Sequence, residues 1–274
     1  MAPFKRYVAN ARETKVVSKV RKKYIHDYCR FLVRRGNIGK SSIVVDIPCG
    51  TGDMAKAIAT KTKFREFILI DINRNMINAA KKKLPRQASF IVGDARDIAK
   101  LVSKKVDTVL CLNGFHQYIE RKKQFLRGCS KILKPEGILI FDISTRGLHD
   151  AYTKEFFKKF EKALDDFVEL KYGKLSSLPK WADQTLMKQY QDMITRSGLK
   201  LIGKNEFITW LTVKDVLDGL QTIPGRSRPW LRGLNYKKRK EAFAHAINAT
   251  IKKMGNRSIE HNRIFYVIRN NLPR

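Results

Sequence analysis

The stretch VVDIPCGTGDM, at residues 44–54, decides the fold of this 274-residue chain. The apolar, β-branched run at residues 41–47 predicts a buried strand, and residues 54–62 predict a helix. The turn between them contains glycines, and glycine lets the backbone approach a ligand closely. Doubly wound α/β folds bind nucleotides at this place, after the first strand. For the turn taken alone, a tight strand-to-helix connection without a ligand is the alternative.

Strands and helices alternate along much of the chain. Apolar runs predict further strands at residues 67–73, 88–94, 106–114, 137–143, 199–208 and 262–269. Helical periodicity predicts helices at residues 15–36, 76–83, 119–133, 183–198 and 237–254. This alternation favours a parallel sheet that is covered by helices on both faces.

The pattern divides the chain into four segments. Residues 1–40 are a basic N-terminal helical segment, and residues 41–146 are the Rossmann-like core that is expected to bind the cofactor. Residues 147–182 are helical and charged, so we expect a cap insertion there. Residues 183–274 supply the last helix and strands of the core, with a second cap insertion at about 212–258.

Three carboxylates stand at the ends of three successive predicted strands. Asp46 ends the first strand, Asp71 ends the second, 25 residues later, and Asp94 ends the third. An acid about 20 residues beyond a glycine turn of this kind accepts hydrogen bonds from ribose hydroxyls. An acid at the end of the third strand can accept from an adenine amino group. Capping of the next helix is the alternative role for Asp71.

This layout resembles that of the class I S-adenosylmethionine-dependent methyltransferases, among them the ubiquinone/menaquinone biosynthesis and malonyl-carrier-protein methyltransferases. The resemblance is close over residues 40–145, and residues 199–269 correspond to the two last strands. It implies S-adenosylmethionine as the cofactor and an α/β fold with a Rossmann-like, doubly wound sheet. That sheet has seven strands, mostly parallel with an antiparallel last strand, plus helical cap segments. The cofactor-binding residues that it implies are Asp46, Cys49, Gly50, Gly52, Asp71, Ile72, Asp94, Ala95, Leu112 and Asn113.

One position departs from the family's pattern. Pro48 stands where the loop usually has its first glycine, and proline fixes φ and has no backbone N–H to donate. Gly50 and Gly52 keep the turn possible. Dinucleotide binding fits less well, because the loop lacks the GxGxxG pattern that holds a pyrophosphate.

The candidate catalytic residue is His116, which follows the fourth predicted strand. A sulfonium methyl group is already activated, so a general base is needed only for a nucleophile that arrives protonated. A histidine that packs the turn is the alternative. The candidate substrate residues are Tyr24, Tyr118, Arg226, Arg228 and Trp230. Arginine suits carboxylates and phosphates and tryptophan offers an apolar platform, whereas a solvated basic loop with packed aromatic residues is the alternative.

The amino-acid composition indicates which kinds of ligand and cell compartment suit this protein. The 57 Lys and Arg residues outnumber 25 Asp and Glu, and the excess, a net charge of +32, is spread along the chain and is densest in residues 1–40. Such charge attracts anions without specifying one. Four cysteines show no CxxC spacing, so we expect neither a metal site nor a disulfide framework, and a reducing cytosol fits. No run of about 18 apolar residues occurs, so we expect a cytoplasmic protein without a membrane span.

We expect a small or carrier-borne, acidic substrate, with an acidic carrier protein as a natural partner. An RNA methyltransferase is the first alternative, because positive charge attracts phosphate. Residues 113–115, however, lack the Asn/Asp-Pro-Pro-aromatic signature of base-amino methylation. A non-catalytic, cofactor-binding protein of the same fold is the second alternative, and the intact acids of the three strands weigh against it.

Overall fold

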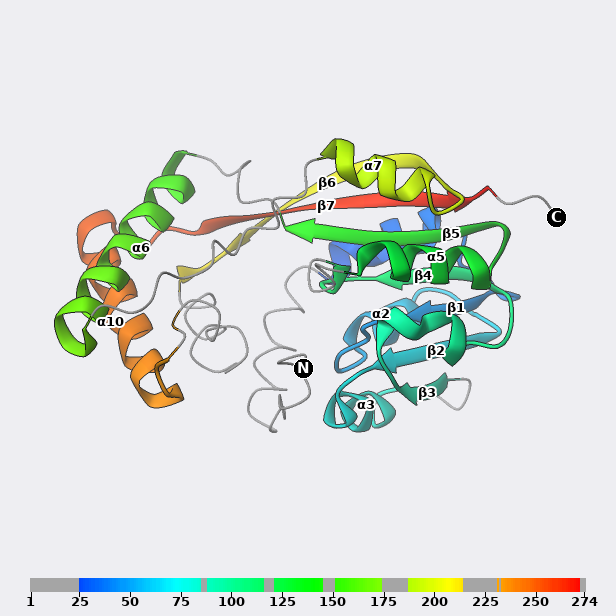
Figure 1. Ribbon diagram of the computed structural model, residues 1–274, viewed down its shortest axis with the longest axis horizontal. Helices are drawn as coiled ribbons and strands as arrows, with labels where there is room; N and C mark the ends of the chain where they lie inside the picture. The colour runs from blue at the N-terminus through cyan, green and yellow to red at the C-terminus, as the bar shows by residue number, and fades with distance from the viewer. Residues whose placement is uncertain are drawn as a thin grey trace.

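The computed structural model describes residues 25–84, 88–115, 121–144, 151–173, 187–213, 231 and 233–271. Within this part of the chain a seven-stranded sheet runs in the order β3-β2-β1-β4-β5-β7-β6 (Figure 1). Its strands are β1 (Ile43–Asp46), β2 (Glu66–Asp71), β3 (Ala88–Val92), β4 (Val106–Cys111), β5 (Leu133–Ser144), β6 (Leu199–Leu211) and β7 (Ile259–Asn270). The helices are residues 25–35, α2 (Asp53–Ala59), α3 (Arg74–Lys81), η2 (Ala95–Asp97), α4 (Ile98–Leu101), α5 (Lys122–Ile132), α6 (Ala151–Tyr172), α7 (Met187–Thr195) and α10 (Tyr236–Met254).

The sheet is doubly wound, as the sequence predicted. Strands β1 to β5 pair in parallel, and β7 pairs antiparallel with both β5 and β6. The strand order therefore reverses between β1 and β4, which pair directly. Ligands of open α/β sheets bind beyond the carboxyl ends of the strands at such a reversal. The topology thus directs attention to the loops that follow β1 and β4.

Each face of the sheet has its own hydrophobic core, because successive side chains of a strand point to opposite faces. Val45 of β1 packs in a cluster with residues of α4, α5 and α7. Its neighbour Val44 packs in a second cluster with residues of α2, α3 and the helix at residues 25–35. The apolar runs that form β1, β2 and β4 are therefore buried on both faces, whereas the edge strands β3 and β6 are partly exposed.

A third hydrophobic cluster lies away from the sheet, between α6 and α10. It includes Phe156 and Phe160 of α6, Phe243 of α10 and Ile259 at the start of β7. Figure 1 shows these two helices beyond the end of β5, where β6 and β7 extend past the other strands. We refer to α6, α10 and this end of the two strands as the helical lobe.

Strand β5 begins earlier than the sequence indicated. The prediction began this strand at residue 137, whereas Leu133 already pairs with Val106 of β4. The side chain of Asn270, at the end of β7, donates from Nδ2 to the carbonyls of Leu133 and Lys134 over 3.0 and 3.2 Å. Contacts with distant strands thus extend β5, and the local sequence carries no sign of them.

In the described part of the chain, no helix combines the length and apolarity that membrane crossing requires.

Candidate functional site

The loop after β1 is held by both neighbouring strands. The amide of Ile47 donates to the carbonyl of Leu110 in β4 at 2.9 Å, and the amide of Cys49 donates to the carbonyl of Ile70 in β2 at 2.9 Å. Gly52 has a φ of 72° and is the N-cap of α2. Only glycine adopts this left-handed conformation without steric cost. The turn therefore leads directly from the centre of the sheet into α2.

Asp71 connects this loop to β2. Its carboxylate accepts the amide of Gly50 through Oδ2 and the amide of Asn73 through Oδ1, both at 2.9 Å. The following helix α3 is capped by the side chain of Asn73, which accepts from the amide of Asn75. The helix-cap alternative for Asp71 is therefore wrong. Because each carboxylate oxygen has two lone pairs, Asp71 can accept from a ribose while it holds the loop.

Asp94, at the end of β3, is engaged by a neighbouring side chain. It caps η2 by accepting the amide of Arg96 at 3.0 Å. The guanidinium of Arg96 also donates to both carboxylate oxygens, with Nε at 2.9 Å from each. These hydrogen bonds from the Arg96 side chain, together with its charge, hold the pKa of Asp94 below its ordinary value. Asp94 is therefore a carboxylate at neutral pH, and any ligand amino group would share it with Arg96.

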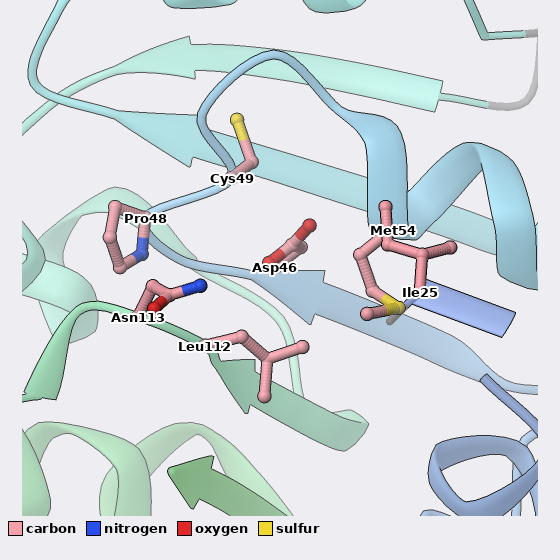
Figure 2. A pocket seen from close by; sticks show the side chains of 7 residues that line it. All are labelled: Ile25, Asp46, Pro48, Cys49, Met54, Leu112 and Asn113. Atoms are coloured by element: carbon pink, nitrogen blue, oxygen red, sulfur yellow. The ribbon is translucent and has the colours of Figure 1, made fainter. Parts of the chain in front are cut away.

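A pocket opens where the sheet reverses its strand order. Figure 2 shows the seven side chains that line it: Ile25, Asp46, Pro48, Cys49, Met54, Leu112 and Asn113. Four of them, Asp46, Cys49, Leu112 and Asn113, were predicted for cofactor binding from the sequence. Asp46 is only 2% exposed, so this carboxylate lies in a largely apolar setting.

The sequence analysis did not identify Ile25 and Met54 as site residues, and Pro48 entered it only as a departure. Ile25 comes from the helix at residues 25–35, and Met54 from α2. The signal for Met54 was its position directly after the glycine turn. Ile25 carried no signal beyond helical periodicity, because its place depends on how the N-terminal helix packs on the sheet. Pro48 follows a cis peptide bond and lines the pocket with its ring.

A buried ion pair stands behind the loop that follows β4. Asp142 of β5 accepts the amide of Asn113 through Oδ1 at 2.6 Å, and its Oδ2 accepts from Nε of Arg263 in β7. Both charged side chains are almost completely buried, with 2% and 3% of their surfaces exposed. The sequence analysis missed this pair. The available signal was a charge within each of two apolar strands, since a buried charge requires a partner.

Of the other predicted site residues, two lie in the described part of the chain and the rest lie outside it. Ile72 is partly buried beside Asp71, and Ala95 is buried behind Asp94. The predicted base and substrate residues lie outside the described residues: Tyr24, His116, Tyr118, Arg226, Arg228 and Trp230. Across the described ranges, no three His, Cys, Asp or Glu side chains gather as metal ligands would.

The family relationship follows from this region of the chain. Residues 44–137 match the model of the methyltransferase domain family. This part of the chain is therefore similar to a methyltransferase domain. The match contains the glycine turn, Asp71, Asp94 and the loop after β4, so this domain contributes six of the seven pocket residues.

Relatives of known activity share this domain. The demethylmenaquinone methyltransferase of Thermotoga maritima is 32% identical over 97 residues, which cover 35% of this chain and 41% of that protein. The malonyl-[acyl-carrier protein] O-methyltransferase of Brevibacillus brevis is 25% identical over 189 residues, 66% of this chain and 63% of that protein. The matches thus span less than two thirds of each of these relatives.

The fold agrees with a solved structure over most of its length. The S-adenosylmethionine-dependent methyltransferase of Geobacter sulfurreducens, crystallised with S-adenosyl-L-homocysteine, superposes with a TM-score of 0.54. The superposition covers 90% of this chain and 91% of that chain at 12% identity. At this identity the likeness concerns the fold, and a fold alone does not determine activity.

Proposed function

We propose that the protein is an S-adenosylmethionine-dependent methyltransferase that acts on a small or carrier-borne, acidic molecule by in-line methyl transfer. The observation that carries the proposal is the pocket at Asp46 and Asn113, with Asp71 and Asp94 on the next two strands. The methyltransferase domain at residues 44–137 supports it.

The chemistry of the pocket fits the cofactor. S-adenosylmethionine carries an ammonium and a sulfonium cation on a short apolar chain. The pocket combines the buried carboxylate of Asp46 with the apolar side chains of Ile25, Met54 and Leu112. A carboxylate in a poorly solvated setting attracts a cation more strongly than one in water. Asp71 would accept from the ribose, and Asp94, shared with Arg96, would accept from the adenine.

The reaction requires mainly positioning. When bound, the cofactor supplies an activated methyl group. The chain would hold a nucleophile in line with that group, and such positioning can contribute roughly 7–11 kcal/mol. The apolar walls of the pocket would keep water away from the methyl group. If the nucleophile arrives protonated, His116 is our candidate for the base that accepts its proton, and Tyr118 follows two residues later in the sequence.

Calorimetry tests cofactor binding. We expect both S-adenosylmethionine and S-adenosylhomocysteine to bind with dissociation constants on the order of micromolar, which corresponds to about −8 kcal/mol. The two ligands should compete for one site, because they share the adenosine and amino acid parts. Titrations without heat for either ligand would contradict the proposal and favour a fold that has lost its cofactor.

Three observations support the substrate class. The malonyl-[acyl-carrier protein] relative acts on a carrier-linked molecule. The helical lobe and the segments predicted as caps supply chain for an enclosed pocket, which is the usual arrangement for small ligands. The net charge of +32 attracts acidic substrates and acidic carriers. The same charge favours RNA, which is therefore the alternative substrate.

Methyl transfer from labelled cofactor distinguishes these substrates. The enzyme is incubated with total RNA, or with a panel of carboxylic acids and acyl-carrier substrates. We expect label in a small or carrier-linked acid, since weak binding of polyanions by a cationic surface need not lead to turnover. Stoichiometric label in RNA alone would overturn this choice of substrate class.

A His116→Ala variant tests the candidate base. If the residue is the base, the substitution should lower turnover more than cofactor affinity.

A further inference from the structure

The Asp142–Arg263 pair occupies a special place in the sheet. Asp142 lies near the carboxyl end of β5, opposite Phe265 of β7, and Arg263 is two residues from Phe265 along β7. The two side chains meet diagonally across the strands and are almost fully buried. Buried ion pairs of this kind contribute little net stability compared with apolar side chains of the same volume. Their presence therefore calls for another role.

That role is indicated by the second oxygen of Asp142. It accepts the amide of Asn113 at 2.6 Å, a short hydrogen bond to a charged acceptor. Asn113 has a φ of 58°, in the left-handed region that few residues other than glycine, asparagine and aspartate adopt routinely. It also lines the pocket, two residues beyond the end of β4. The carboxylate of Asp142 thus holds the backbone at the point where β4 gives way to the pocket.

Arg263 makes this arrangement possible. Burial of a carboxylate without a countercharge is strongly unfavourable, and Arg263 supplies the countercharge of Asp142. Arg263 is 121 positions away in the sequence and reaches Asp142 only after β7 has paired with β5. The backbone at Asn113 is therefore supported, through Asp142, by β7, the last strand in the chain.

We propose that Asp142 and Arg263 are positioning residues that fix the backbone of Asn113 for cofactor binding. The proposal deepens the proposed function and rests on it for its binding readout. Neither residue lines the pocket itself, and Asp142 reaches it only through the backbone amide of Asn113. They act through the Asn113 amide, so their loss should be seen in the loop and in cofactor affinity.

The test uses a variant that removes the pair without leaving a buried charge, Asp142→Leu combined with Arg263→Met. Replacing both partners by apolar residues often leaves stability unchanged, so the denaturation midpoint should stay close to that of the wild type. Hydrogen exchange of the peptide that contains Asn113 should be about tenfold faster without ligand. The dissociation constant for S-adenosylhomocysteine should rise about tenfold, the loss expected for one hydrogen bond to a charged acceptor.

The chain offers a matched control at the other end of the sheet. Asp107 of β4 likewise accepts a backbone amide, that of Ile43, at 2.8 Å, and the ammonium of Lys134 at 2.7 Å. Asp107→Leu with Lys134→Met removes an amide acceptor and its ion pair near the start of β4 and β5, although these two side chains are 29% and 42% exposed. This control should leave the exchange at Asn113 and the affinity unchanged. Equal effects of the two double variants would show a merely structural role and overturn the proposal.

Each remaining outcome is also decisive. Wild-type exchange and wild-type affinity in the folded Asp142→Leu, Arg263→Met variant would overturn the positioning role. If the wild type itself does not bind S-adenosylhomocysteine, the proposed function fails, and exchange at Asn113 alone then decides whether the pair positions the loop. If the double variant does not fold, Asp142→Asn replaces it. We then expect smaller losses of protection and affinity, and wild-type values would contradict the proposal.

Discussion

Gly52→Ala should lower the free energy of unfolding by about 2–4 kcal/mol, the combined cost of a left-handed residue and an overpacked contact. The φ of 72° at Gly52 disfavours every residue with a Cβ atom. A Cβ at this position would also lie 3.0 Å from the Cβ and 3.3 Å from the Cα of Ala80, which is buried in α3. Relief would require α2 and α3 to move apart. Denaturation in urea, followed by circular dichroism, measures the effect.

The control for this variant is Gly39→Ala. An added Cβ at Gly39 meets no atom within 4 Å, so the substitution should leave stability nearly unchanged or raise it slightly. The Gly52→Ala variant should also bind the cofactor more weakly, because the turn would shift. A Gly52→Ala protein as stable as Gly39→Ala would show that the turn tolerates a side chain and does not require a left-handed residue at position 52.

Asp71→Ala should weaken cofactor binding by about 100-fold, because a charged acceptor worth roughly 1.5–3 kcal/mol per hydrogen bond is removed. A residue that contacted only the ligand would leave folding almost unaffected when replaced. The structure adds a cost, since the variant leaves the amides of Gly50 and Asn73 without their acceptor. We therefore expect the free energy of unfolding to fall as well, by about 1–3 kcal/mol. Calorimetry and urea denaturation measure the two effects separately.

Asp71→Asn serves as the matched control. Its amide oxygen can accept one of the two backbone amides, of Gly50 or of Asn73, whereas its NH2 group then faces the other. Only part of the stability should therefore return, and the loss of charge should keep the affinity below that of the wild type. Normal cofactor affinity in Asp71→Ala would show that Asp71 serves only the loop, and the ribose assignment would then be wrong.

The sequence by itself determined the class of fold and the edge at which ligands would bind. Buried strands have a short apolar pattern, and the glycine turn between residues 44 and 54 needs no distant partner to be recognised. The parallel pairing of β1 to β5 follows from the alternation of strands and helices. Because parallel strands place their carboxyl ends at one edge, Asp46, Asp71 and Asp94 could be assigned to one site before any contact was known.

Tertiary structure decided which atoms these residues meet. The engagement of Asp94 by Arg96 and of Asp71 by Gly50 depends on side-chain rotamers and loop conformation, which periodicity does not encode. Ile25 reaches the pocket only because its helix packs across the sheet. Arg263 finds Asp142 across 121 positions only when β7 inserts beside β5. A sequence pattern predicts where a helix or strand lies and which of its faces is buried. Contacts between elements depend on packing and strand register, which exist only in the folded chain.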